Sequence, residues 1–184
     1  KIKTITFENK IDIDENAIET WDISDSQNGN IMSYIVYNSE DSAYYDLYIQ
    51  SDTIIYANND MSNWFRGFTN LDAIVNLELL DTRYVNNMGH MFYYTGSNSQ
   101  IFTLDLSSFN TSKVTNMSHM FYYTGYNSPA FELNVSEFDT SNVTLMDNMF
   151  YYTGYNSSTF NLNVSNFNTS KVTNMNSMFN GTGY

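Results

Sequence analysis

Apolar and polar residues alternate over a short stretch that begins at Phe102 and returns at Phe131 and Phe160. In the first copy, Phe102, Leu104 and Leu106 stand at every second position, with polar residues between them. A period of two places successive side chains on opposite faces of an extended chain. The pattern therefore predicts a half-buried β-strand at the start of each copy.

The pattern changes period after each predicted strand. Val114, Met117, Met120 and Phe121 fall at positions i, i+3, i+6 and i+7, which is one apolar stripe of a helix. Residues that commonly cap helix N-termini precede the segment, and glycines that commonly end helices follow it. Each copy is therefore predicted to run strand, turn, short helix and loop. The predicted N-caps are Asn110, Asp139 and Asn168, or the Thr after each, and the glycines are Gly125 and Gly154.

A 29-residue period organises the second half of the chain. The second methionine of the block that starts at Met88 recurs at positions 91, 120, 149 and 178, without insertion or deletion. A fixed period of this size is typical of stacked repeats. Stacking should superpose Val114, Val143 and Val172 in one continuous core. Because strands pack about 4.8 Å apart and helices need about 8–10 Å, we expect a curved α/β solenoid with its strands on the concave face.

Residues 1–70 do not follow this period and read as a β-rich N-terminal cap. Strand-like composition occurs at residues 1–7, 31–37, 43–50 and 53–57, and the second and third of these suggest a hairpin. Trp21 is expected to anchor a small core there. Met61, Trp64 and Phe65 repeat the spacing of Met88, Met91 and Phe92, which indicates a degenerate first coil within this cap. Residues 71–184 then form an array of about four repeats.

The segment 104–121, Leu-Asp-Leu-Ser-Ser-Phe-Asn-Thr-Ser-Lys-Val-Thr-Asn-Met-Ser-His-Met-Phe, resembles the repeat of BspA-type leucine-rich repeat surface proteins of bacteria. The resemblance covers at least residues 71–184. It implies a leucine-rich-repeat-like fold and an extracellular, non-enzymatic protein of the bacterial cell surface that adheres to host or matrix. The chain departs from many relatives in its loop, where Tyr-Thr-Gly-Tyr-Asn-Ser replaces Gly-Cys-Ser.

Charge and composition narrow the range of partners. The net charge is −13, from 20 acidic and 7 basic residues, so nucleic acid and anionic membranes are poor partners. The chain has no cysteine, and no run of 18 apolar residues that could insert in a membrane. The last repeat reaches Tyr184 without a polar cap, so we expect a fragment of a longer chain. We expect it to be monomeric.

Tyrosine offers the sharpest binding candidates. On a helix with Val114 and Phe121 pointing inward, one tyrosine of each Tyr-Tyr pair points outward, with His119 beside Tyr123. Exposed tyrosines give large, rigid contacts to proteins or glycans, although they could equally cover the edge of the stack. The candidate ligand-binding residues are Tyr94, Tyr123 and Tyr152 in one column and Tyr126, Tyr155 and Tyr184 in a second.

The outward positions of the predicted strands are a second candidate, because curved repeats commonly bind on their concave face. These positions are small and polar, without the Trp or Arg anchors typical of binding hot spots. The alternative is a solvated face whose side chains bond along the stack. The candidates are Asp105, Asn134 and Asn163, with Thr103, Ser107, Glu132, Ser136, Asn161 and Ser165 around them.

Metal and catalytic sites are not indicated. His90 and His119, on adjacent predicted helices, would lie about 8–10 Å apart, too far to share one zinc ion. The segment 12–16 starts like a calcium loop, but Ala17 and Ile23 stand where Gly and Glu are needed. No cofactor motif or nucleophile–base arrangement occurs. Two functions remain: an adhesion module, and a structural spacer that displays another part of a surface protein.

Overall fold

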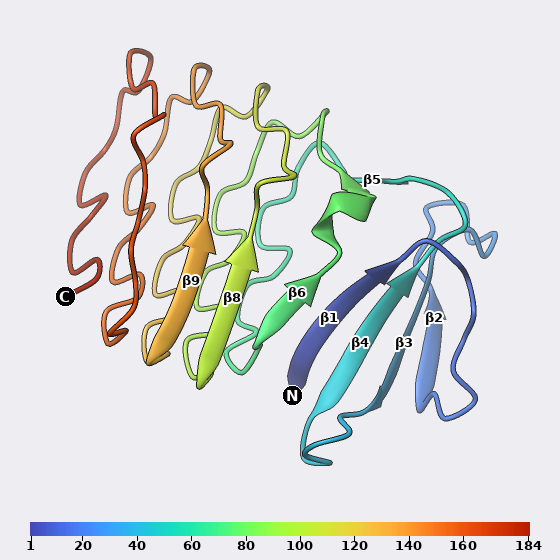
Figure 1. The fold of residues 1–184 in the computed structure, drawn as a ribbon. Coiled ribbons are helices and arrows are strands. Elements are labelled where there is room, and N and C mark those ends of the chain that lie inside the picture. Colours follow the sequence, from blue (N-terminus) through green and yellow to red (C-terminus); the bar gives the residue numbers. More distant parts are fainter.

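The computed structural model describes residues 1–184 and consists mainly of strands and turns. Its one helical element is the short 3-10 helix η1 (Leu77–Leu79). Seven strands form one mixed sheet in the order β2-β3-β4-β1-β6-β8-β9 (Figure 1). Their bounds are β1 (Ile2–Glu8), β2 (Glu19–Asp22), β3 (Met32–Tyr37), β4 (Tyr45–Gln50), β6 (Ala73–Val75), β8 (Ile101–Asp105) and β9 (Ala130–Asn134). The short strands β5 (Ile55–Tyr56) and β7 (Leu80–Asp81) pair separately.

The first strand joins the N-terminal region to the repeats. β1 lies between β4 and β6 and is parallel to both, so strands from both sides of residue 70 share one sheet. The predicted hairpin is confirmed, because β3 pairs antiparallel with β4. The prediction for Trp21 is wrong: its side chain is 40% exposed on β2, the edge strand of the sheet. It therefore anchors no core.

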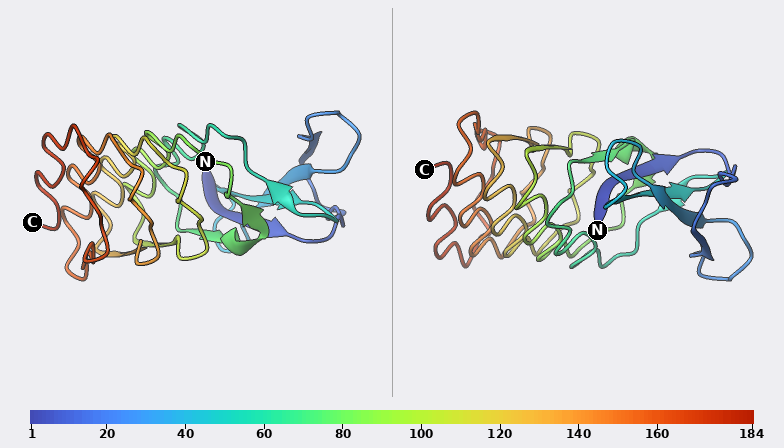
Figure 2. Two further views of the ribbon diagram at one scale, coloured as in Figure 1. Left: turned by 90° about the horizontal axis from the view of Figure 1, so that it is seen from above. Right: turned by 90° about the horizontal axis from the view of Figure 1, so that it is seen from below.

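Successive 29-residue coils lie side by side, with equivalent residues paired. β8 and β9 are parallel, with Phe102 opposite Phe131 and Leu104 opposite Leu133. On the other side of the coils, isolated bridges join Asn87 to Asn116, Asn116 to Leu145 and Leu145 to Asn174. Figure 2 shows the coils stacked from the N-terminal sheet to the C-terminus. The predicted register of equivalent residues is therefore confirmed, including the burial of Val114 and Val143 in one core that Val172 packs against.

The predicted short helices are wrong, because overlapping turns take their place. In the coil after Met88, the N–H groups of residues 91, 93 and 95 donate to carbonyls three residues earlier, over 2.9–3.3 Å. The N–H groups of residues 88, 90, 92 and 94 instead donate to the next coil, to the carbonyls of Asn116, Ser118, Met120 and Tyr122, over 2.8–3.0 Å. The segment is therefore a chain of turns that is also bonded laterally, as a strand would be. Residues 61–67 bond to residues 87–93 in the same way.

Backbone conformation explains why no helix forms. His90 and Tyr94 have φ values of 59° and 61°, and equivalent left-handed residues recur in each coil. A left-handed residue interrupts a right-handed helix, and the asparagines and serines of the segment favour turns. The predicted N-caps form turns as well: Asn110 Oδ1 accepts the N–H of Ser112 at 3.1 Å. The apolar stripe still points inward, because a spacing of three also fits successive turns.

Hydrogen bonds between the turns of successive coils set the distance at which the turn side of the array repeats. Phe92 and Phe121 on the turn side have ring centroids 5.6 Å apart, and Phe102 and Phe131 on the strand side have theirs 5.3 Å apart. The two sides therefore repeat at nearly the same distance, unlike a layer of strands opposed to a layer of helices. The prediction of a turn side spaced as widely as packed helices is thus wrong, and with it the reason for a curved array.

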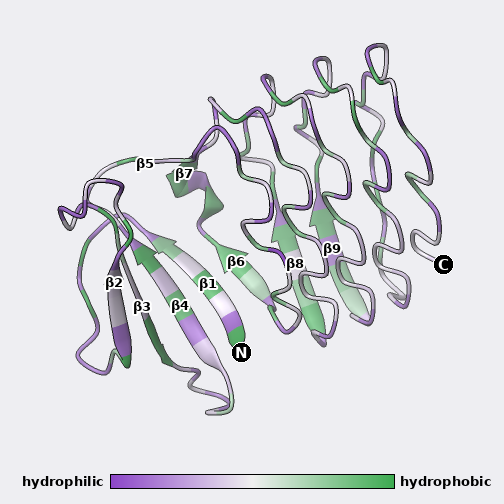
Figure 3. Cartoon of the chain, turned by 180° about the vertical axis from the view of Figure 1, so that it is seen from behind, coloured by the Kyte–Doolittle hydropathy of each residue, from purple (hydrophilic) through white to green (hydrophobic).

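Columns of equivalent side chains form the core. Phe92, Phe121 and Phe150 are fully buried and stack ring on ring, and the methionines around them are also buried. Figure 3 shows hydrophobic residues along β1, β8 and β9 and more polar turns at the coil ends. The last coil differs: residues 160–164 form no strand, although the rings of Phe160 and Phe131 are 5.1 Å apart. Stacking thus continues one coil beyond the sheet.

Candidate binding surface

The turn layer brings tyrosines from successive coils into three neighbouring columns, here called the tyrosine surface. Tyr94, Tyr123 and Tyr152 have left-handed backbone, and each ring contacts its neighbour in the Tyr-Tyr pair at a tilt, with centroids 4.8–5.0 Å apart. Because the coils are in register, each side chain meets its equivalent in the next coil. The columns are Tyr93–Tyr122–Tyr151, Tyr94–Tyr123–Tyr152 and Tyr126–Tyr155–Tyr184.

The rings of each column lie face to face. Within the column of Tyr94, Tyr123 and Tyr152, centroids are 4.8 and 5.1 Å apart, and in the column of Tyr93 they are 4.7 and 4.8 Å apart. Tyr126 and Tyr155 are 5.3 Å apart. Tilted contacts of 4.8–5.0 Å join neighbouring columns, as between Tyr123 and Tyr126. The predicted columns are therefore brought together into one continuous aromatic surface.

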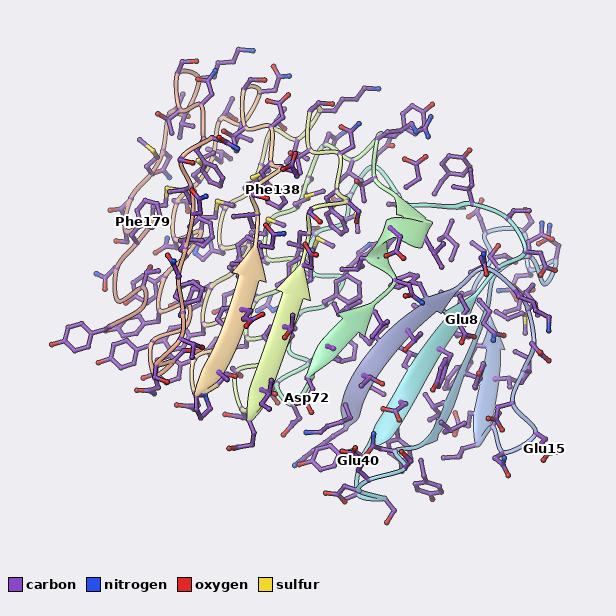
Figure 4. All side chains as sticks on the ribbon, in the orientation of Figure 1. Glu8, Glu15, Glu40, Asp72, Phe138 and Phe179 are labelled. Atoms are coloured by element: carbon purple, nitrogen blue, oxygen red, sulfur yellow. The ribbon has the colours of Figure 1, made fainter.

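The edges of these rings face solvent. All the tyrosines of the surface are half-buried except Tyr184, which is 89% exposed. Their hydroxyl groups make no hydrogen bond within the protein, and none is buried. The surface thus presents rows of free hydroxyl groups and ring edges, while the ring faces are used in stacking. Figure 4 shows the side chains of the array, with Phe138 and Phe179 labelled in its C-terminal coils.

Two histidines extend the surface, in a geometry different from the prediction. The rings of His90 and His119 stack at 4.6 Å, so the expected separation, that of packed helices, is wrong. His119 contacts Tyr122 at 5.5 Å rather than lying beside Tyr123. Its Nδ1 is buried and lies 3.6 Å from Asp147 Oδ2. No group of three or more His, Asp or Glu side chains in the structure is arranged to hold a metal ion.

The tyrosine surface ends against a cation at its N-terminal side. The guanidinium carbon of Arg66, in the degenerate coil, lies 4.6 Å from the centroid of the Tyr93 ring. Arg66 occupies in that coil the position that the first tyrosine of each pair holds in the regular coils. A cation over a ring face is favourable, so Arg66 covers the face that the column would otherwise expose.

Burial changes the ionisation of the tyrosine hydroxyls. It raises the pKa of Tyr94 and Tyr122 above 10.0, and raises the pKa of Tyr123 to about 12, with smaller contributions from neighbouring tyrosines. The charged tyrosinate is disfavoured because the stack leaves it only part of its hydration. Tyr94, Tyr122 and Tyr123 therefore stay neutral over the whole physiological pH range.

These pKa shifts predict a loss of stability at alkaline pH. Below about pH 10 the hydroxyls are protonated in the folded and unfolded chains, and the stabilising contribution is complete. Between about pH 10 and 12 the unfolded chain loses protons first, so the free energy of unfolding should fall as the pH rises. Urea denaturation between about pH 9 and 12 measures this slope. Changing Tyr94, Tyr122 and Tyr123 together to Phe should reduce it.

Part of the alkaline fall in the free energy of unfolding should remain in the variant with Tyr94, Tyr122 and Tyr123 changed to Phe. Tyr34 and Tyr48 in the N-terminal sheet also have raised pKa values, through burial, and the pKa of Tyr34 reaches about 12. At neutral pH the triple variant should keep its stability, because the removed hydroxyls bond to no protein atom. An unchanged alkaline slope in the variant would contradict the assignment of these pKa shifts to the tyrosine surface.

The strand face holds the other candidate residues, partly bonded to one another. Asn134 Nδ2 donates to Asp105 Oδ1 at 2.9 Å, along the stack. Asn163 Oδ1 instead accepts the N–H of Ser165 at 3.0 Å. A hollow of about 440 Å³ opens on this face, lined by Asp105 and Asn134 but not by Asn163. The structure therefore brings Asp105 and Asn134 together but not Asn163. Side-chain oxygen or nitrogen atoms of all three already form hydrogen bonds within the protein.

One column of the tyrosine surface, that of Tyr93, was not predicted from the sequence. Tyr93, Tyr122 and Tyr151 were not among the candidates, because a helix would turn successive residues by about 100° and bring only one tyrosine of each pair outward. Left-handed residues recur at intervals in the turn layer, as at His90 and Tyr94, and both tyrosines of each pair reach the surface. The signal was the Tyr-Tyr pair itself, repeated in three coils.

The fold and the surface define a repeat protein, and comparison with known families agrees. The family described as "Mycoplasma protein of unknown function, DUF285" matches residues 57–130 and 126–183, which is more than half of the chain. The chain belongs to this family, and the two adjacent matches reflect its repeats. No curated protein and no solved structure matches it significantly. None of its helices could cross a membrane.

Proposed function

We propose that this chain is a non-enzymatic module of a bacterial cell-surface protein that mediates adhesion by binding a host or matrix protein or a glycan. The observation that carries the proposal is the tyrosine surface, with its row of solvent-facing hydroxyls in each column. Its resemblance to BspA-type leucine-rich repeat proteins supports an extracellular location. Its acidic net charge supports solubility outside the cell and argues against nucleic acid.

The tyrosine surface suits recognition because it is ordered before a partner arrives. Each ring stacks on at least one neighbour about 5 Å away, so little side-chain entropy remains to be lost on binding. Tyrosine offers an apolar ring edge and a hydroxyl that donates and accepts hydrogen bonds. Because the ring faces are covered, a partner contacts edges and hydroxyls. A partner with repeated hydrogen-bonding groups would match the coil spacing best.

The leucine-rich-repeat-like solenoid is proposed on similar grounds. Parallel strands with inward Leu104 and Leu133, and coils of constant length paired in register, are features of such folds. The turn layer departs from the resemblance, since it forms lateral hydrogen bonds in place of helices.

One observation favours the alternative of a structural spacer. The tyrosine rings cover one another, and the surface therefore also closes one edge of the core. Near-identical coils suit a stiff rod that displays another domain. The two functions differ in whether this chain has a ligand of its own.

A binding screen separates the two functions. The chain is passed over arrays of glycans and immobilised matrix proteins, and any hit is measured again with two variants. Changing Tyr126 and Tyr155 together to Ala removes two rings and should weaken binding at least tenfold. Changing Thr103 and Glu132, both exposed on the strand face, to Ala is the matched control and should leave affinity unchanged.

The outcomes are distinct. Circular dichroism should show that both variants fold, because Tyr126 and Tyr155 lie outside the buried Phe and Met columns. Weaker binding only in the tyrosine variant supports the proposed surface. Equal loss in the control assigns binding to the strand face. A screen without any hit overturns adhesion and leaves the spacer.

A further inference from the structure

An apolar pocket of about 450 Å³ opens where the N-terminal sheet meets the first coil. Its size falls in the range of ligand-binding pockets, about 300–1,000 Å³. It lies on elements that do not carry the tyrosine surface. Twelve of its fourteen lining residues are hydrophobic, among them Ile23, Ile31, Leu47, Ile49, Tyr56 and Trp64.

The pocket exists because the sheet extends further than the layer that covers it. In the repeats, turns bonded from coil to coil cover the inward face of β8 and β9. The first such coil begins at Met61, and β4 and β3 lie beyond it in the sheet. The apolar side chains of Ile31, Leu47 and Ile49 are therefore only partly buried. They form the floor of the pocket.

Large apolar side chains form its rim. Tyr56 is 56% exposed, Ile23 is 49% exposed and Trp64 is 38% exposed. Exposed Trp and Tyr around a preformed pocket are characteristic of interfaces in which a partner inserts an anchoring side chain. In an isolated chain these groups would face water at a cost in free energy. The rim therefore indicates a macromolecular partner.

The charge in and around the pocket discriminates between acidic and basic partners. Asp25 is the one charged residue that lines the pocket, and its carboxylate forms no hydrogen bond or ion pair in the structure. Residues 1–75 contain 13 acidic and 4 basic residues, so the surrounding field is negative. A fatty acid or an acidic peptide would be repelled, and a basic segment would be attracted.

We propose that this pocket binds a basic peptide segment of a partner protein. One large apolar side chain of the segment enters the pocket, between the floor and Trp64. A neighbouring Lys or Arg of the segment pairs with Asp25 at the rim. The site is independent of the tyrosine surface, so each can fail in experiment without the other.

Fluorescence of Trp64 reports binding directly. Trp21 is first changed to Phe, because it is exposed on the edge strand and would add background. The probe is a capped peptide Gly-Lys-Leu-Phe-Leu-Lys-Gly, which should quench or shift Trp64 emission in a saturable way. Two matched peptides are the controls: one with Ser in place of Leu and Phe, and one with Glu in place of Lys. Both should bind at least tenfold more weakly.

Two variants locate the contact. Ile23→Ser should weaken binding of the basic apolar peptide about tenfold, whereas Ile101→Ser, at a side chain 64% exposed on β8, should not change it. Asp25→Asn should weaken it about three- to fivefold, as expected for an exposed ion pair, and should improve binding of the Glu peptide. All three side chains are exposed, so the fold should be kept.

Three results would overturn the proposal. The first is equal binding of the basic apolar peptide and its serine counterpart, which would mean attraction by charge alone. The second is an equal effect of Ile23→Ser and Ile101→Ser. The third is no binding of the apolar basic peptide. Because Tyr126→Ala and Tyr155→Ala should leave this peptide's affinity unchanged, failure here leaves the proposed adhesion by the tyrosine surface intact.

Discussion

Replacing Phe121 by Ala is expected to lower the free energy of unfolding by about 3–5 kcal/mol, the usual cost of removing a buried aromatic side chain. Phe121 is 0% exposed and stacks between Phe92, at 5.6 Å, and Phe150, at 5.3 Å. Its coil cannot collapse onto the space left, because its backbone is fixed on both sides. The N–H of Phe121 donates to the carbonyl of Met149 in the next coil at 2.9 Å, and the carbonyl of Met120 accepts the N–H of Phe92 in the preceding coil at 2.9 Å. Urea denaturation at neutral pH measures the loss.

Phe179 supplies the matched control, because it belongs to the same column. It stacks on Phe150 at 5.6 Å but is 48% exposed, with a neighbouring ring on one side only. Phe179→Ala should therefore cost only about 1 kcal/mol, in proportion to the area that it buries. Equal losses at the two positions would show that the column does not pack as a continuous core.

The sequence predicted the register of the array and its inward side chains, because both follow from the period. Coils of equal length can pair only with equivalent residues opposite, and Leu104 opposite Leu133 is the result. Alternation around Phe102 and Phe131 was enough to locate β8 and β9, since a period of two fits only an extended chain with one buried face. The third copy, residues 160–164, has the same pattern without forming a strand.

The turn layer could not be deduced in the same way. An apolar stripe at i, i+3, i+6 and i+7 fits a helix, but it also fits successive three-residue turns. The choice depends on hydrogen bonds to the next coil, such as Tyr94 N–H to the Tyr122 carbonyl, and these are non-local. Left-handed backbone at a histidine or tyrosine costs about 1–2 kcal/mol, so local propensity argues against it. Lateral bonding repeated over the stack offsets that cost.

The difference between register, which follows from the period, and turn geometry, which depends on non-local hydrogen bonds, also decided which parts of the tyrosine surface were predicted. The columns that begin with Tyr94 and Tyr126 were predicted because register alone aligns them. The column that begins with Tyr93 and the close pair of His90 and His119 depend on turn geometry, which the helix interpretation excluded. The apolar pocket also could not be predicted from the sequence, because its floor and rim come from widely separated parts of the chain.

Gly125→Ala is expected to lower the free energy of unfolding by about 2–5 kcal/mol, which combines left-handed strain with overpacking. Gly125 has φ +61°, and a Cβ atom there would lie 2.6 Å from two atoms of the Phe131 ring. That ring stacks at 5.3 Å on Phe102 and at 5.1 Å on Phe160, so it cannot move aside without disturbing both neighbours. Urea denaturation measures the effect.

Gly67→Ala separates the two contributions. Gly67 has φ +80°, but a Cβ atom there would meet no atom within 4 Å, so the substitution introduces backbone strain alone. It should cost about 1–2 kcal/mol. A larger loss at Gly125 than at Gly67 would therefore measure contact with the Phe131 ring. Equal losses in the free energy of unfolding at the two glycines would mean that the Phe131 ring moves aside to make room for the Cβ atom. The close approach of loop and strand in each coil would then not fix the position of the phenylalanine column.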